Sequence, residues 1–387
     1  MKVRYKNLDG KLKAVSRVYT EEEHKLDFSK IDPDAIKVTE RLQEKGYEAY
    51  IVGGAVRDIL IGKQPKDFDI VTDASPRQVH KIFRNSRLIG HRFRIVHVIY
   101  GKKIFEVSTF RSTAEHDDYS DNNYGTMEED ASRRDFSINS LYYNPSDRTI
   151  TDFNGALNDL RNKKIRSLIP LYRTFIEDPV RMIRAVKLAA VTGFSMNFSL
   201  RIAIKKYAST LESVSSSRLT EEVNKILSSG HSCDIIRELS RFGLLVYILP
   251  CLSVYIRFSQ LFDSLQELDD EVNRLKENGE DIPLSLLYYK LVSPFITDTS
   301  PELSSQETFR DIFRQVKVLI SPNTPPNQEL ENAVVIYMKE KGYKLKRQVR
   351  KAEPKPKEKQ NAQSARKARN RSYYAKRSKK ATPRSEQ

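Results

Sequence analysis

The sequence has little of what secreted and membrane proteins need. Its 387 residues include two cysteines, Cys233 and Cys251, too few for a disulfide framework, and His231 beside them does not complete the spacing of a zinc site. No apolar run reaches the ~20 residues of a membrane-spanning helix, and the longest, around 244–256, contains Pro250. The first residues have no apolar segment behind their charges, so no secretory signal is expected. These features predict a cytoplasmic protein with reduced cysteines and no membrane segment.

Acidic and apolar residues are scarce at the C-terminal end. The chain holds 67 Lys and Arg against 51 Asp and Glu, a net charge of +16. Residues 351–387 carry +10 of it, with thirteen Lys and Arg against three Glu and no Leu, Ile, Val or Phe. Such a segment cannot offset the entropy lost on ordering, so we expect disorder. It is either a solubilising tail or an RNA-binding arm, because phosphates attract Lys and Arg without needing a fold.

The remainder divides into a strand-rich part and a helical part. Short runs of β-branched residues predict strands at 49–52, 69–72, 96–100 and 104–110. Ser75 and Pro76 are typical of a helix start and predict a helix over 77–83. The polar stretch 111–127 predicts a loop, and from about residue 176 to 338 the periodicity is helical. The predicted fold class is therefore α+β.

Paired glycines open the segment that is richest in functional groups. The predicted strand at 49–52 runs into Gly53 and Gly54, and a helix is expected behind them. Glycines let the backbone approach a ligand closely, and the free amides of a helix start favour an anion. Arg57 would lie one turn into that helix, near the same anion. The alternative is a tight connection without a ligand.

Two carboxylates follow at the start of the next predicted strand. Asp67 and Asp69 are two residues apart and are expected on the same face, where they repel each other unless a cation lies between them. Oxygen ligands of this kind suit Mg²⁺ that is shared with substrate phosphates. A pair of such ions can serve an in-line displacement at phosphorus. The alternative is two solvated carboxylates.

A third polar cluster lies at Arg133, Arg134 and Asp135. Arg134 could bind a phosphate or a ribose, and Asp135 could be a further metal or ribose ligand. Glu106, on the predicted strand 104–110, is a competing third carboxylate. The alternative is a solvated turn with local ion pairs.

These segments together resemble a known family. The motifs are Gly53-Gly54-Ala55-Val56-Arg57-Asp58, Asp67-x-Asp69, Arg133-Arg134-Asp135-Phe136-x-Ile138-Asn139 and Glu177-Asp178-Pro179-Val180-Arg181. Their order resembles the class II nucleotidyltransferases of the DNA polymerase β superfamily, which comprise bacterial poly(A) polymerases and CCA-adding tRNA nucleotidyltransferases. Asp152-x-x-Gly155 resembles the hinge motif of that family, and 218–227 resembles its later neck motif.

The resemblance implies a polymerase-β-like nucleotidyltransferase head, an all-helical neck and body, and a disordered basic tail. It implies Mg²⁺ on Asp67 and Asp69, with Asp135 catalytic at the same site. It further implies a nucleotide site formed by Gly53, Gly54, Arg57, Arg134, Asp178, Arg181 and Arg184. The predicted division is an N-terminal extension (1–45), a head (46–160), a neck (161–230), a body (231–340) and a tail (341–387).

The neck motif is suited to selecting a base. Asp178 and Arg181 are expected to share a helix face, so one group accepts and the other donates a hydrogen bond. Adenine and cytosine present the matching donor and acceptor, whereas guanine and uracil present the reverse order. Family members often carry Arg where this chain has Lys187, which places a bidentate or stacking role there in doubt. The alternative is a surface ion pair of little energy.

The predicted function is template-independent addition of AMP from ATP to the 3′ ends of mRNA and other RNAs, in mRNA processing and decay. Residues 83–98 and 139–144 resemble the polymerase branch, and a basic tail suits varied RNA ends. RNA-decay proteins are expected as partners. The alternatives are a CCA-adding enzyme and, remotely, a non-catalytic RNA-binding protein, which the presence of both Asp67 and Asp69 disfavours.

Overall fold

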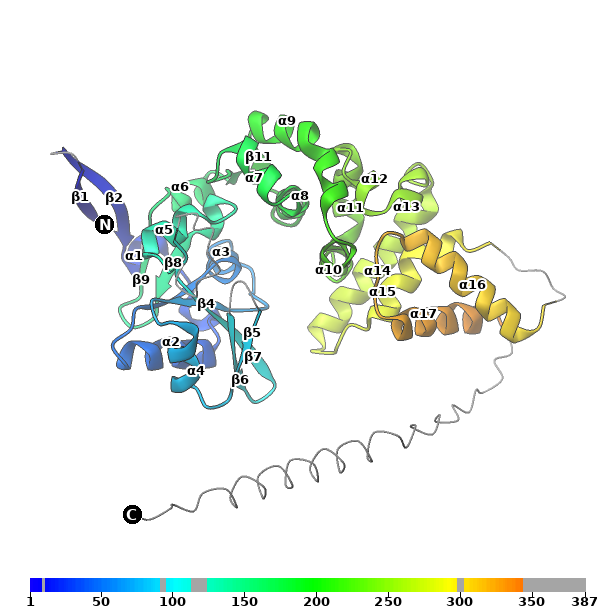
Figure 1. Cartoon of the computed structure of the whole chain (residues 1–387), viewed down its shortest axis with the longest axis horizontal. Coiled ribbons are helices and arrows are strands. Elements are labelled where there is room, and N and C mark those ends of the chain that lie inside the picture. Colours follow the sequence, from blue (N-terminus) through cyan, green and yellow to red (C-terminus); the bar gives the residue numbers. More distant parts are fainter. Residues whose placement is uncertain (9–10, 91–94, 113–123, 298–302, 344–387) are drawn as a thin grey trace, which may run out of the picture. The chain divides into compact units, whose positions relative to one another are not determined.

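The computed structural model describes residues 1–8, 11–90, 95–112, 124–297 and 303–343 (Figure 1). Residues 1–343 form one compact unit. The predicted tail lies outside the described residues from residue 344 onward, as does most of the predicted loop 111–127.

A nine-stranded mixed sheet dominates the first half of the described chain. Its strand order is β1-β2-β9-β8-β3-β4-β7-β6-β5. Among these strands, neighbours pair antiparallel except β4 and β7, which are parallel. The strands are β1 (Lys2–Leu8), β2 (Lys11–Tyr19), β3 (Ala49–Val52), β4 (Asp69–Thr72), β5 (Ser86–Ile89), β6 (Ile95–Tyr100), β7 (Lys103–Thr109), β8 (Leu141–Asn144) and β9 (Thr149–Asp152).

The strands and the helix start that the sequence predicts are confirmed to within one residue at β3, β4, β6, β7 and α4. Ser75 caps α4: its hydroxyl accepts from the amide of Gln78, whose side chain accepts in return from the amide of Ser75. Residues 1–45, set apart as an extension, supply β1, β2 and a helix that packs on β3 and β4.

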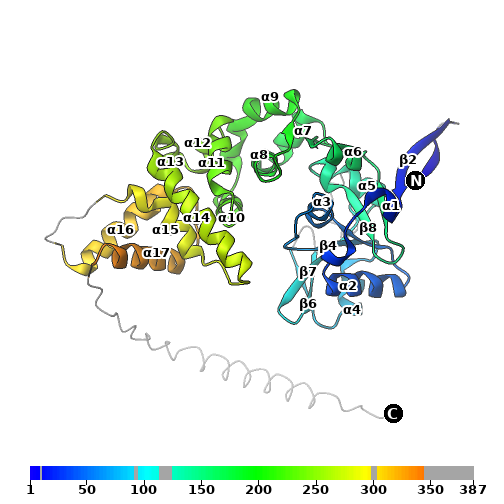
Figure 2. The same ribbon diagram turned by 180° about the vertical axis from the view of Figure 1, so that it is seen from behind.

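Short helices cover the sheet and its edges. Both ribbon views place α2 and α4 side by side, and α4 contacts β5, β6 and β7 (Figures 1 and 2). A core of buried side chains from β3, β4, β8 and α5 lies beneath the ends of β3 and β4. The helices are α1 (Glu21–His24), η1 (Phe28–Lys30), α2 (Pro33–Glu44), α3 (Gly54–Leu60), α4 (Pro76–Ile82), α5 (Met127–Ser132), η2 (Ser137–Asn139) and α6 (Ala156–Arg161).

The second half of the described chain is helical, as the periodicity predicts, apart from the parallel pair of two-residue strands β10 (Lys164–Ile165) and β11 (Ser195–Met196). Among the described residues, no helix is long and apolar enough to cross a membrane. The helices are α7 (Leu171–Glu177), α8 (Val180–Thr192), α9 (Phe198–Tyr207), η3 (Ala208–Ser213), α10 (Ser216–Leu227), α11 (Ser232–Arg241), α12 (Leu245–Ile248), α13 (Pro250–Val254), α14 (Ser259–Glu277), α15 (Leu284–Val292), η4 (Ser293–Phe295), α16 (Ser305–Ile320) and α17 (Asn327–Glu340).

Helix α8 carries the basic residues of the predicted neck site. It begins after Pro179 and ends at Gly193, whose positive φ of +69° closes the helix in the left-handed conformation. Its apolar side chains are buried, while Arg181, Arg184 and Lys187 recur every third residue along it. The helix therefore presents a row of cationic side chains from a fixed, packed base.

Candidate active site

The turn after β3 brings the predicted glycines next to two charged groups. Gly53 has a φ of +74°, which disfavours every residue with a side chain. A Cβ atom at this position would lie 3.4 Å from Oδ2 of Asp69 and 3.7 Å from Nη1 of Arg134. Helix α3 begins at the next residue, Gly54, as predicted. The backbone of this turn thus lies directly against the carboxylate of Asp69 and the guanidinium of Arg134.

Asp67 and Asp69 are both exposed, and the residues between and after them are buried. Strand β4 begins at Asp69, so Asp67 lies just before the strand rather than within it. Phe68 is 6% exposed and Ile70 is fully buried, which is the alternation expected for neighbours on opposite faces. The pattern of exposure is therefore the one that the sequence predicts for two carboxylates on one face.

Glu106 is the carboxylate that the strand register places beside Asp69. The parallel pairing of β4 with β7 sets Asp69 opposite Glu106, and His97 on β6 is opposite Glu106 in turn. Nε2 of His97 lies 3.5 Å from Oε1 of Glu106. Asp69 reaches solvent, but protein atoms packed around its carboxylate displace water from it. This desolvation, followed by the negative charge of Glu106, raises the pKa of Asp69 to about 6, although Arg134 opposes the shift.

Arg134 is held in place by groups that the sequence analysis did not identify. Its guanidinium donates to Oδ2 of Asp130 at 3.0 and 3.2 Å and to the hydroxyl of Tyr142 at 3.1 Å. The same Tyr142 hydroxyl donates to Asp130 at 2.6 Å. Tyr142 is fully buried and Asp130 is 7% exposed, so this charged group is fixed before any ligand arrives.

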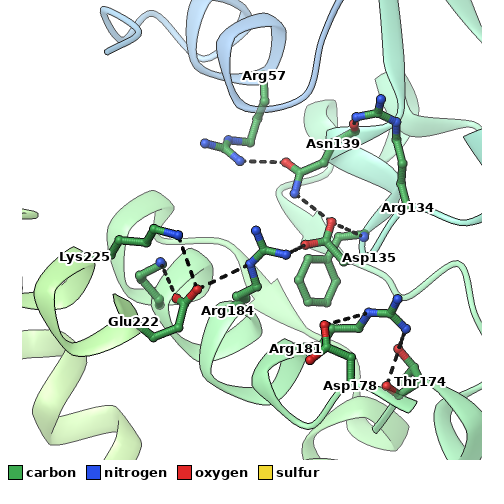
Figure 3. Close-up of polar contacts among 12 residues, drawn as sticks. Arg57, Arg134, Asp135, Asn139, Thr174, Asp178, Arg181, Arg184, Glu222 and Lys225 are labelled. Carbon is green, nitrogen blue, oxygen red and sulfur yellow. Dashed lines mark hydrogen bonds and ion pairs between the residues drawn. The ribbon is translucent and has the colours of Figure 1, made fainter. Parts of the chain in front are cut away.

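Asp135 lies in a line of polar contacts between the sheet domain and the helices (Figure 3). Arg57 donates to Oδ1 of Asn139 at 2.6 Å, and Nδ2 of Asn139 donates to Oδ1 of Asp135 at 3.0 Å. The other oxygen of Asp135 lies 3.6 Å from Nη1 of Arg184 on α8. The predicted residues Arg57, Asp135 and Arg184 are thus brought together through Asn139, which ends the same motif but was not among the predicted site residues.

Glu222 on α10 anchors the far end of this line. It is 5% exposed, and its carboxylate lies 3.0 Å from Lys187 Nζ, 3.7 Å from Lys225 Nζ and 3.9 Å from Arg184 Nε. Burial alone would raise the pKa of Glu222, but the charges of Lys187 and its neighbours lower it below the ordinary value. Lys187, itself half-buried, therefore serves as the ion-pair partner of the buried Glu222.

Asp178 and Arg181 lie close together, but Asp178 is not on a helix. It occupies the break between α7 and α8, because the following Pro179 disfavours the helical conformation at the residue before it. Oδ1 of Asp178 accepts from Arg218 at 2.8 Å, and Oδ2 lies 3.9 Å from Nε of Arg181. Arg181 also donates to Oγ1 of Thr174 at 3.1 Å. An acceptor and a donor are thus oriented by Arg218 and Thr174.

The sequence of this chain is similar to those of known proteins. Residues 49–166 match the family described as the poly A polymerase head domain, and residues 193–256 match the probable RNA and SrmB-binding site of polymerase A. Poly(A) polymerase I of Escherichia coli O6:H1 (strain CFT073) is 40% identical over 322 residues, which cover 76% of this chain and 68% of that protein. The chain belongs to the family of the bacterial poly(A) polymerases. The resemblance read from the motifs is therefore confirmed.

Other members of the poly(A) polymerase family show how far the similarity extends. Poly(A) polymerase I of Salmonella typhi is 41% identical over 260 residues, covering 64% of this chain but only 56% of that protein. A CCA-adding enzyme of Geobacillus stearothermophilus is 33% identical over 219 residues, which cover 56% of this chain and 54% of that enzyme. The chain thus spans little more than half the length of the first of these relatives.

A solved structure confirms the predicted fold class. A tRNA nucleotidyltransferase complexed with a primer tRNA and an incoming ATP analog superimposes with a TM-score of 0.54 at 27% identity, over 79% of this chain and 84% of that chain. The head-domain match includes the Gly53 turn, Asp69 and Asp135, whereas Asp178 and Arg184 lie between the two family matches.

The raised pKa of Asp69 predicts a pH-dependent stability. Between its ordinary pKa of 3.8 and about 6, the folded protein holds a proton at Asp69 that the unfolded chain releases, so the free energy of unfolding falls as the pH rises through this window. The variant Asp69→Asn should therefore melt at a higher temperature than the wild type at about pH 7.5, and the gain should vanish below about pH 4. Melting curves recorded without divalent ions check this. A gain of the same size at both pH values would contradict the burial of this carboxylate.

Proposed function

We propose that the chain is a template-independent RNA nucleotidyltransferase that adds AMP from ATP to RNA 3′ ends. The observation that supports it most is the position of Asp69, which lies against the Gly53 turn and Arg134 and is paired in register with Glu106. Carboxylates beside a close-approach turn and a fixed guanidinium are the groups that phosphoryl transfer uses. Identity of about 40% to two bacterial poly(A) polymerases favours adenylate addition.

The donor set fits Mg²⁺, the metal that the family implies. In the described part of the chain, no group of three or more His, Cys, Asp or Glu is assembled to hold a metal by itself. Mg²⁺ commonly takes one or two carboxylates and completes its shell with water and substrate phosphates. Asp67 and Asp69 would hold it, with Glu106 beside them, and a cation there would relieve the charge repulsion that adds to burial in raising the pKa of Asp69. When bound, Mg²⁺ supplies charge stabilisation and lowers the pKa of a coordinated hydroxyl.

The residues around the turn are suited to the triphosphate. Gly53 and Gly54 let the backbone approach the phosphates, and Arg57 and Arg134 provide positive charge beside them. In the reaction the primer 3′-hydroxyl forms a bond to the α-phosphorus as the bond to the bridging β-phosphate oxygen breaks, and pyrophosphate leaves. Arg134 is fixed by Asp130, so it can stabilise that leaving charge without reorganisation.

The break between α7 and α8 is suited to read the base. Asp178 would accept from the exocyclic amine of adenine, and Arg181 would donate to the ring nitrogen beside it. Arg218 and Thr174 hold these two groups, so the acceptor and donor are set before the base arrives. Guanine and uracil would place acceptor against acceptor and are rejected, because unpaired polar groups are costly in a closed site.

The remaining assignments concern partners and location. RNA is the proposed partner, supported by the match of residues 193–256 to an RNA-binding site family, and RNA-decay proteins are further proposed partners. We keep the five-part division and the cytoplasmic location as proposals. Co-purification of RNA-decay proteins with the tagged chain would test these partners. Recovery of the chain from the soluble fraction of lysed cells would test the location.

The third catalytic carboxylate is predicted to be Glu106 rather than Asp135. Glu106 is opposite Asp69, whereas Asp135 accepts from Asn139 and faces Arg184. Glu106→Gln should lower kcat by about 100-fold with little change in the KM for ATP, and Asp135→Asn should mainly raise that KM. Steady-state kinetics with a fixed RNA primer measure both. A larger loss of kcat from Asp135→Asn would return the assignment to that residue.

The product distinguishes polyadenylation from CCA addition. With Mg²⁺ and ATP alone, the chain should extend a generic RNA into a long ladder, and Asp69→Asn should reduce the rate by several orders of magnitude. A tRNA lacking its CCA end, supplied with ATP and CTP, serves as the second primer. Two additions of C and one of A, followed by a stop, would identify a CCA-adding enzyme, as some relatives of this chain are named.

The basic tail is predicted to bind RNA through phosphates. Residues 351–387 carry thirteen Lys and Arg, and each phosphate contact adds to the salt dependence of binding. Removing them should weaken RNA binding and flatten the plot of log affinity against log salt, while leaving the KM for ATP unchanged. An unchanged slope would mean that the segment does not contact RNA.

A further inference from the structure

Two lysine side chains converge on the turn after α10, and one of them immediately precedes Asp67. Lys66 immediately precedes Asp67, and its Nζ lies 3.4 Å from the carbonyl oxygen of Ser228, just after α10. Lys276 comes from α14, far along the chain, and its Nζ donates to the carbonyl oxygen of the next residue, Ser229. Two ammonium groups from separate elements thus lie at adjacent residues of a single turn.

The turn between α10 and α11 is shaped to bring Lys276 close. Gly230 has a φ of +78°, and a Cβ atom there would lie 3.0 Å from Lys276 Nζ and 2.0 Å from Oδ1 of Asn273. Asn273 also donates to the carbonyl of Gly230 at 3.3 Å. Only glycine allows α14 to approach this closely, so the position of the Lys276 ammonium is set by backbone packing.

No carboxylate neutralises the two lysines within the described residues. Neither Lys66 nor Lys276 forms an ion pair there, and Asp269, whose charge acts on Lys276, accepts from the amides of Ser232 and Cys233 at 2.7 and 2.9 Å. Burial, followed by the neighbouring Lys66 charge, lowers the pKa of Lys276 to about 8. The ammonium groups therefore repel each other, and an anion between them would remove that repulsion.

A third lysine adds to the positive charge of this region. Nζ of Lys63 donates to the carbonyl of Val191 in the last turn of α8 at 2.7 Å. Burial and then the charge of Lys63 lower the pKa of His231, while Asp269 and Asp234 oppose that shift. The surroundings of the turn thus carry more positive than negative charge, and Lys66 is exposed to solvent.

We propose that Lys66 and Lys276 bind a phosphate group of a substrate, one residue away from the catalytic Asp67. The inference rests on the proposed function, because that function supplies two phosphate-bearing substrates, RNA and ATP. Lysines act as compact point charges, which suits a backbone phosphate that is held without reading its base. A phosphate here would also tie the segment that carries Asp67 to the helices that flank the turn.

The test measures RNA affinity without turnover. Fluorescence anisotropy with a labelled oligoadenylate, across a series of KCl concentrations, is applied to full-length chains carrying Lys66→Met or Lys276→Met. Each variant should weaken binding by about three- to tenfold and reduce the slope of log affinity against log salt by about 0.7. Lys66→Arg and Lys276→Arg should stay close to wild type. Lys339→Met, at an exposed position of α17, is the matched control and should leave binding unchanged.

The KM for ATP distinguishes the two sources of phosphate. Weaker RNA binding with an unchanged KM places the RNA backbone on these lysines, and a raised KM with unchanged RNA binding places the triphosphate there. Unchanged values for both would overturn the site. An equal loss in the Met and Arg variants, together with a lower melting temperature, would overturn it in favour of a structural contact to the carbonyls. The binding assay needs no polymerisation. Its result can therefore be interpreted even if the chain does not polyadenylate RNA.

Discussion

The proposed active site combines residues of the sheet domain with residues of α8, and it depends on the contact of Asp135 with Arg184. One residue belongs to the turn after α5 in the sheet domain and the other to α8, and their charged groups lie 3.6 Å apart. Asn139 orients Asp135 from one side, and Glu222 faces Arg184 from the other. Because Asp178 lies just before α8, this ion pair connects the part of the site that holds the proposed catalytic carboxylates to the part proposed to read a base.

Charge is distributed in this site so that each ligand group has a counterpart. Asp69 at the start of β4 and Glu106 opposite it on β7 place negative charge side by side, and burial, followed by the charge of Glu106, raises the pKa of Asp69 to about 6. Arg134 is neutralised in part by Asp130, which fixes its direction, and it still lies next to the Gly53 turn. A site arranged in this way stabilises a cation and a polyphosphate together better than either alone, because each ligand screens charges that would otherwise repel.

The sequence predicts what depends on local pattern and misses what depends on tertiary contact. Strands β3, β4, β6 and β7, the cap at Ser75 and the close approach at Gly53 follow from periodicity, turn residues and glycine chemistry. The strands at 2–8 and 11–19 were not predicted, although polar and apolar residues alternate over 2–5 and 11–14, because each alternating stretch is only four residues long. The partners Tyr142 and Glu222 were also missed, since a buried tyrosine or glutamate has no local signal for the distant arginine or lysine it meets.

A double-mutant cycle on Asp135 and Arg184 tests the composite site most directly. Asp135→Asn, Arg184→Gln and the double variant are compared by the free energy of ATP binding, measured by calorimetry without primer. If the two groups act as one unit, the double variant loses less than the two single losses added together, with a coupling of about 0.5 to 3 kcal/mol. Losses that add to within about 0.3 kcal/mol would show that the sheet domain and α8 bind the nucleotide independently, and would contradict the account.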